Sequence, residues 1–124
     1  YFLFMIRETY VKYFEYFTQY CQEDCKPEYQ NIPGLAEDFC LTALREFICF
    51  AASAMLGRIC YLIPYPDYDD IYYYVQRHNA KCFSIILNRE MLVKWESYNS
   101  IDEFIQDILT IEEIYCINIK DLKL

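Results

Sequence analysis

Glycine, proline and histidine are scarce in this chain of 124 residues, which holds 2 Gly, 4 Pro and one His. Tight turns and phosphate-cradling loops need glycine, so a many-stranded β fold and a glycine-rich nucleotide site are excluded. The single histidine and the lack of a paired-cysteine motif disfavour a zinc site. We therefore expect an all-α protein that is not an enzyme and binds no metal or cofactor.

Basic residues are also few. Eleven Lys and Arg face nineteen Asp and Glu, which gives a formal charge of −8. A nucleic-acid surface needs clustered cations to neutralise phosphates, and an anionic membrane surface attracts cations. Both kinds of partner are disfavoured, and a protein partner that tolerates an acidic host is expected.

Cysteine is present in an odd number. The seven residues lie mostly inside apolar helical patterns, at positions 21, 25, 40, 49, 60, 82 and 116. This indicates reduced, buried thiols of an intracellular protein rather than a disulfide framework. Cys21 and Cys25 form the only close pair and could bridge.

Aromatic residues are abundant, with 14 Tyr, 9 Phe and one Trp. The length suits one domain, residues 1–124, but this is more aromatic surface than one small core easily buries. Five tyrosines between positions 65 and 74 cannot all face inward from one helix: Tyr65, Tyr68, Tyr72, Tyr73 and Tyr74. We expect some of them to line a groove or a subunit contact; the alternative is simple crowding on a helical surface.

Helical periodicity marks the chain from end to end. The set Ile6, Tyr10, Phe14, Phe17 and Cys21 predicts an amphipathic helix that ends before Pro27, and residues 26–34 read as a loop. Helical signal resumes at Leu35, with a break expected near residues 51–53, where Ser53 would cap a new helix.

Later helices are predicted from their caps. Pro64 and Pro66 should stop the central helix, and Asp67 should begin one that runs to about Trp95. Its buried stripe would comprise Ile71, Val75, His78, Cys82, Ile85 and Ile86, with His78 packed inside. Ser100 with Glu103, and Thr110 with Glu113, predict two further helices. The total is six to eight.

The central run from Phe47 to Ile63 contains only Ser53 and Arg58 as frankly polar residues. It is shorter than the roughly 20 residues of a membrane span, and a central arginine opposes insertion. We expect a buried helix whose Arg58 emerges at a groove or pairs with a carboxylate. The alternative is that Arg58 reaches solvent or forms an internal ion pair.

Three segments resemble the Bcl-2 family. Met55-Leu56-Gly57-Arg58-Ile59 matches the last three positions of its first homology motif. Trp95, followed by Ile101-Asp102-Glu103-Phe104-Ile105, resembles the second homology motif, with Ile101 in place of a Trp. Residues 7–16 resemble the amphipathic N-terminal segment. The shortened, diverged motifs look like a viral homologue from a large DNA virus such as an iridovirus or poxvirus.

The resemblance implies a helical bundle around a central hydrophobic helix, with a surface groove for the BH-3 helix of pro-apoptotic proteins. It implies that Arg58 pairs with the ligand's aspartate and that Gly57 allows close approach. Met55 replaces the family's Asn, so one polar contact is lost. The expected ligand-binding residues are Ile48, Cys49, Phe50, Met55, Leu56, Gly57 and Arg58, and those of the second motif are Trp95, Ile101, Asp102 and Phe104.

The implied function is inhibition of apoptosis by sequestering Bim-like and Bak- or Bax-like proteins in the host cytoplasm, with association with mitochondria as an option. A homodimer is credible because of the surplus tyrosines. Two alternatives stay open. One is a Bcl-2-like viral module with a closed groove that homodimerises or blocks innate signalling adaptors. The other is a helical bundle unrelated to the family.

Overall fold

The structure is a computed structural model that describes residues 1–60, 68 and 70–121, and in the last helix the side chains as far as residue 116. This part of the chain holds five α-helices, a short 3-10 helix and no strand. The elements are α1 (Phe2–Glu23), α2 (Pro27–Gln30), α3 (Leu35–Ile59), α4 (Tyr74–Lys94), η1 (Trp95–Ser97) and α5 (Ile101–Asp121). The all-α class is confirmed, whereas the described residues form fewer helices than the six to eight expected.

Two predicted helix starts are wrong, and both fall at hydroxyl residues inside long helices. The Ser53 hydroxyl donates to the Cys49 carbonyl at 2.9 Å, within α3. The Thr110 hydroxyl donates to the Gln106 carbonyl at 2.9 Å, within α5. Each hydroxyl bonds back to the preceding turn of its own helix, so neither is available to cap a new one.

The helix expected from Asp67 begins later than predicted. Asp67 lies outside the described residues, as do Pro64 and Pro66, but α4 starts only at Tyr74. Arg77, in the first turn of α4, reaches back to the segment before the helix. Its guanidinium donates to the Ile71 carbonyl from Nε at 3.0 Å and from Nη2 at 2.8 Å. This side chain ties the non-helical segment to the first turn of α4.

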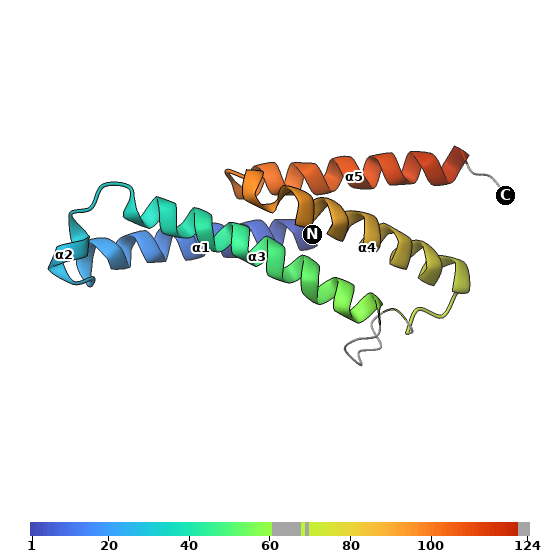
Figure 1. Cartoon of the computed structure of the whole chain (residues 1–124), viewed down its shortest axis with the longest axis horizontal. Coiled ribbons are helices and arrows are strands. Elements are labelled where there is room, and N and C mark those ends of the chain that lie inside the picture. Colours follow the sequence, from blue (N-terminus) through green and yellow to red (C-terminus); the bar gives the residue numbers. More distant parts are fainter. Residues whose placement is uncertain (61–67, 69, 122–124) are drawn as a thin grey trace.

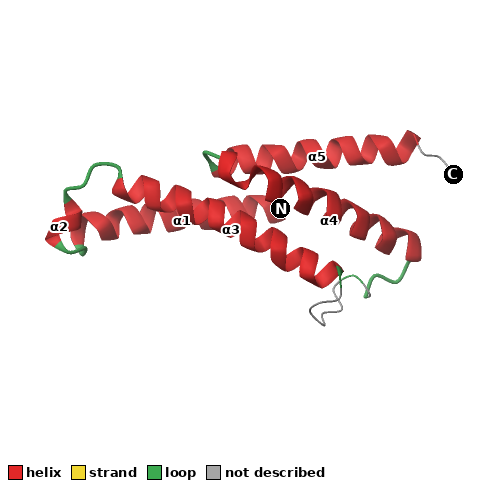
Figure 2. Ribbon diagram, viewed as in Figure 1, coloured by secondary structure: helices red, strands yellow, loops and turns green. Residues whose placement is uncertain are grey.

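The long helices form an extended antiparallel arrangement (Figure 1). α1 and α3 run side by side in opposite directions and are joined at one end through α2. α4 returns along the other half of α3, and η1 turns the chain into α5. Figure 2 shows that α1 is connected to α3 through the short helix α2 and a loop, and that a tight connection leads from η1 into α5.

One core lies where these helices meet. It is built on one face of α3, where Leu44, Ile48 and Ala52 recur every four residues and are almost completely buried. Four residues from the other elements complete it: Met91, Tyr98, Ile101 and Phe104. The α3 face is therefore the surface on which α4, η1 and the start of α5 are assembled.

The face of α4 that packs inward is not the predicted one. Asn88 and Met91 are buried, whereas the predicted stripe turns outward, with Val75 exposed by 68% and Ile86 by 42%. His78 is exposed as well, so its predicted packing is wrong. Because α4 carries apolar residues on both sides, its periodicity marks two possible faces and does not identify the one that packs.

Burial of apolar side chains is incomplete in the described residues. Eleven hydrophobic residues are buried, but twenty-one large hydrophobic residues are exposed. Scattered exposed apolar residues are normal, but contiguous patches mark interaction sites. The exposed aromatics therefore direct attention to the outer faces of α1, α3 and α4.

By length and composition, α3 is the one helix among the described residues that could cross a membrane. Core helices of soluble proteins meet the same criterion. α3 carries Arg45 and Glu46 near its middle, where charges oppose insertion. α3 packs against both α1 and α4, but only 22% of its most apolar stretch is buried, so it is central without being the buried helix that was expected.

A polar network joins α4, η1 and α5 at the edge of the core. The Tyr98 hydroxyl donates to Asp107 Oδ2 at 2.6 Å, and Lys94 Nζ lies 3.0 Å from Asp107 Oδ1. Burial, together with the neighbouring carboxylate, raises the pKa of Tyr98 well above its usual value. The Asp107 hydrogen bond raises the pKa of Lys94.

Asn88 is fully buried, and neither its side-chain nitrogen nor its oxygen has a hydrogen-bond partner among the described residues. Leu branches at the same carbon and has no polar atoms to desolvate. We predict that Asn88→Leu stabilises the fold by about 1–2 kcal/mol, measured by urea denaturation. Asn31→Leu, on an exposed residue, should leave stability unchanged. A loss of stability in Asn88→Leu would contradict the prediction.

Tyr98→Phe should destabilise the fold by about 1.5–3 kcal/mol, because Asp107 loses a buried hydroxyl donor. The raised pKa of Tyr98 means that the folded state keeps the phenol proton after the unfolded chain loses it. Wild-type stability should therefore fall as the pH rises above about 10, and Tyr98→Phe should lack this part of the loss. Denaturation from pH 8 to 11 measures both effects, with exposed Tyr16→Phe as the control.

Candidate functional site

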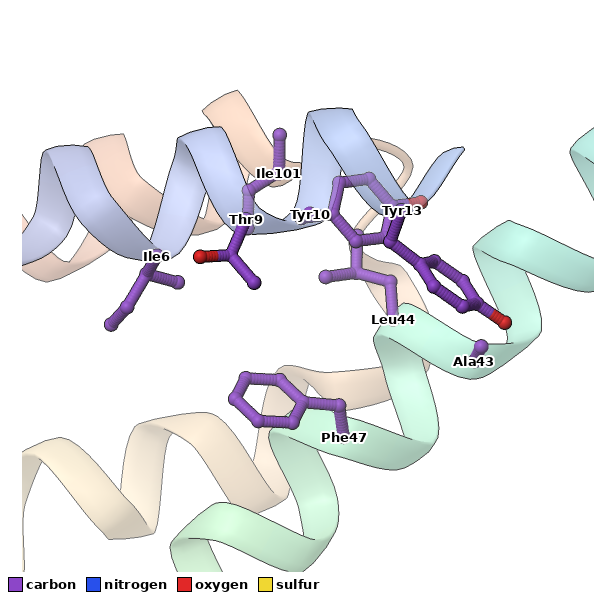
Figure 3. A pocket seen from close by; sticks show the side chains of 8 residues that line it. All are labelled: Ile6, Thr9, Tyr10, Tyr13, Ala43, Leu44, Phe47 and Ile101. Atoms are coloured by element: carbon purple, nitrogen blue, oxygen red, sulfur yellow. The ribbon is translucent and has the colours of Figure 1, made fainter. Parts of the chain in front are cut away.

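An apolar groove opens between α1 and α3. It encloses a volume of about 360 Å³ and is lined mainly by these two helices, with one residue from the first turn of α5 (Figure 3). The lining residues are Ile6, Thr9, Tyr10, Tyr13, Ala43, Leu44, Phe47 and Ile101. None of them is charged. In Figure 3, Ile6 and Thr9 face Phe47 across the open space.

The α1 wall combines Ile6 and Tyr10 of the inward stripe with Thr9 and Tyr13 of a second stripe. Its members recur every three or four residues and therefore share one side of the helix. They are Phe2, Met5, Thr9, Tyr13, Tyr16 and Tyr20. Tyr16 is 69% exposed, so this stripe continues along α1 beyond the residues that line the groove.

On α3 the groove is lined by Ala43, Leu44 and Phe47, and two of these belong to an apolar stripe with similar spacing. Phe39, Ala43, Phe47 and Phe50 recur every three or four residues, on the side of α3 next to its core face. Phe47 is 51% exposed and Phe50 is 75% exposed. Phe39 stacks on Phe17 of α1 with ring centroids 4.6 Å apart, which joins the two walls at one end.

The floor of the groove is held by contacts across helices. The Tyr10 hydroxyl donates to the Cys40 carbonyl at 3.1 Å, and burial raises the pKa of Tyr10. Arg7 Nε lies 2.6 Å from Asp102 Oδ1, which ties the first turn of α5 to α1. The Tyr10 hydroxyl at the floor therefore has a hydrogen-bond partner, and the open surface of the groove is apolar.

The residues of the first homology motif lie away from this groove. Met55, Leu56, Gly57 and Arg58 are half-buried in the last turns of α3. Arg58 lies eleven residues beyond Phe47, about 16 Å along the helix. Met55 packs against the core. The expected binding residues are thus not gathered into one cavity.

The three residues predicted to form a groove wall on α3 differ in their burial. Ile48 is fully buried in the core, so in this conformation it cannot contact a ligand. Cys49 is half-buried. Phe50 is exposed, but it is not among the residues that line the groove.

The second homology motif supplies packing. Ile101 and Phe104 are buried in the core, and Trp95 packs against it. Asp102 is exposed and forms the ion pair with Arg7. Of these residues only Ile101 also lines the groove.

The groove residues that sequence reasoning missed are Tyr13 and Phe47, along with the stripes to which they belong. A signal was present, since α1 and α3 each carry apolar residues over more than one face. Only the inward stripe of α1 was recognised from its periodicity. Periodicity finds a stripe without showing whether another helix covers it.

Other chemistry is sparse in the described part of the chain. No group of three or more metal-ligating side chains forms there. His78 Nε2 and Cys82 Sγ are 3.5 Å apart on one face of α4, as their spacing predicts. All seven cysteines are free thiols, so Cys21 and Cys25 do not bridge.

Comparison of the chain with protein-family models, curated proteins and solved structures finds no match in any of the three.

Proposed function

We propose that this protein binds an amphipathic helix in the groove between α1 and α3, and that it acts as an inhibitor of apoptosis by sequestering BH-3 helices of pro-apoptotic proteins. The uncharged groove carries the proposal, because an amphipathic helix lays its apolar face into an apolar groove of this kind. The resemblance to the Bcl-2 motifs supports the choice of ligand.

The shape of the groove suits a helix more than a small molecule. Its walls are two antiparallel helices with aromatic residues spaced every three or four positions. A helix laid between them would present its own apolar residues at matching intervals, which is the usual mode of helix-in-groove recognition. Tyr13 and Phe47 stand on opposite walls and are the best candidates for anchoring contacts.

Arg58 lies apart from the groove. The resemblance gives it the ligand's aspartate as a partner, yet it lies about 16 Å from Phe47 along α3. A ligand helix that reaches both would run along α3 past Phe50. The two residues therefore test different parts of the same binding mode.

Calorimetry with a panel of BH-3 peptides tests the groove. Wild-type protein should bind at least one peptide, and Phe47→Glu should weaken that binding by about 2 kcal/mol or more, because it places a charge at an apolar contact. Ile114→Glu, on an exposed residue of α5, is the matched control and should bind like the wild type. Absence of binding by every peptide at high micromolar concentration would refute the proposed function.

A double-mutant cycle tests Arg58. Arg58→Ala and replacement of the peptide's aspartate by alanine should each weaken binding by a few kcal/mol at most, and the double change should cost less than the sum. Additive losses would show that Arg58 does not contact that aspartate. Such a result would leave the groove itself intact as the binding site.

A further inference from the structure

The groove between α1 and α3 is closed at the end that lies toward α2. Four rings gather there, and we call them the aromatic cluster: Tyr13, Phe17, Tyr20 and Phe39. Phe17 is at their centre. Its ring centroid is 5.9 Å from that of Tyr13, 6.4 Å from that of Tyr20 and 4.6 Å from that of Phe39. The rings are therefore in contact from α1 across to α3.

The aromatic cluster begins where the lining of the groove stops. Phe17 follows the lining residue Tyr13 by four positions on α1, and Phe39 precedes the lining residue Ala43 by four positions on α3. Because α1 and α3 are antiparallel, both steps lead toward α2 (Figure 1). The rings of Phe17 and Phe39 are stacked, with 13° between their planes, and together they join the two helices one turn beyond the groove.

The opposite end of the groove is open. The α1 stripe continues from Met5 to Phe2, where α1 begins, and the α3 stripe continues from Phe47 to Phe50. Phe2 is 72% exposed and Phe50 is 75% exposed, so these two rings do not cover each other. α3 itself runs on to Ile59. A helix lying in the groove can therefore extend past this end but not past the aromatic cluster.

The lined part of the groove is about two helical turns long. On α1 its lining runs from Ile6 to Tyr13, which is seven residues and about 10 Å at 1.5 Å per residue. A ligand helix can place the apolar residues of two turns there, at the spacing typical of helices bound in grooves. A helix that continued in the other direction would meet the ring of Phe39.

We infer that the aromatic cluster determines the specificity of the groove by selecting helices that end beside their apolar residues. This inference rests on the proposed binding of an amphipathic helix. The last apolar residue of the ligand contacts Tyr13, and the ligand helix ends within about one turn of it. A partner whose helix continues on both sides of its apolar residues collides with Phe39, and such a collision is a usual means of rejecting similar ligands.

Calorimetry with extended peptides tests this role. The shortest BH-3 peptide that binds is lengthened at one end or the other by two turns of uncharged, alanine-rich helix. Lengthening a peptide in this way favours its helical form, so it does not by itself weaken binding. For the wild type, extension at one end should raise the dissociation constant about tenfold or more, and extension at the other end should not raise it.

Phe39→Ala should remove most of that effect, so that the short peptide and the peptide extended at the sensitive end bind within about threefold of each other. Phe50→Ala changes another exposed phenylalanine of α3 and is the matched control, which should keep the tenfold ratio. Phe39 is 51% exposed, so its replacement should be compatible with folding. The ratio compares two peptides on one protein and does not depend on the fraction of it that is folded.

The outcomes separate this inference from the proposed function. If both extensions leave the affinity of the wild type unchanged, or if Phe39→Ala keeps the tenfold ratio, the inference is overturned while helix binding stands. Absence of binding by every peptide would refute both. As a second measurement, a photoreactive residue at the sensitive end of the short peptide should cross-link to the aromatic cluster, as mapped by mass spectrometry. Cross-links only to residues 50–59 would overturn the inference.

Discussion

The packing of α3 between α1 and α4 is the contact on which the rest of the structure depends. Leu44, Ile48 and Ala52 place one almost fully buried face along this helix, and α4 and η1 pack on it. Because that face continues without interruption past Ser53, α3 stays helical where a break was expected. Phe47, which lies on the neighbouring side of α3, is consequently left facing α1 in the groove wall.

The second constraint is an excess of apolar surface over what one core can hold. α1, α3 and α4 each carry more apolar residues than a single buried stripe requires, and the surplus is left on their outer sides. Exposed apolar surface is costly in water, so a contiguous exposed patch favours burial against a partner. The groove between α1 and α3 is one such patch.

Several elements follow from local sequence alone. The inward stripe of α1, the start of α3 and the capping of α5 are all local signals. In the capping box the Glu103 amide donates to Ser100 Oγ at 3.1 Å, and the Glu103 carboxylate accepts from the Asn99 amide at 2.8 Å. Such signals depend on neighbours within one turn, so tertiary contacts rarely overrule them.

Ser53 and Thr110 show why similar local signals can mislead. A hydroxyl residue followed by helix formers resembles a cap, but inside a helix that is buried along one face it bonds to the preceding turn instead. The choice lies between ending the helix and keeping its packed face continuous. In α3 the core residues on both sides of Ser53 favour continuity.

By itself the sequence determined the helical class, the one-domain length and the apolar periods, because these depend on residue types and on spacing within a helix. Only the tertiary structure decided which apolar face each helix buries. It turned Met91 of α4 inward and Val75 outward, and it separated Arg58 from the groove at Phe47. The physical reason is that periodicity describes one helix alone, whereas burial depends on which other helix lies against it.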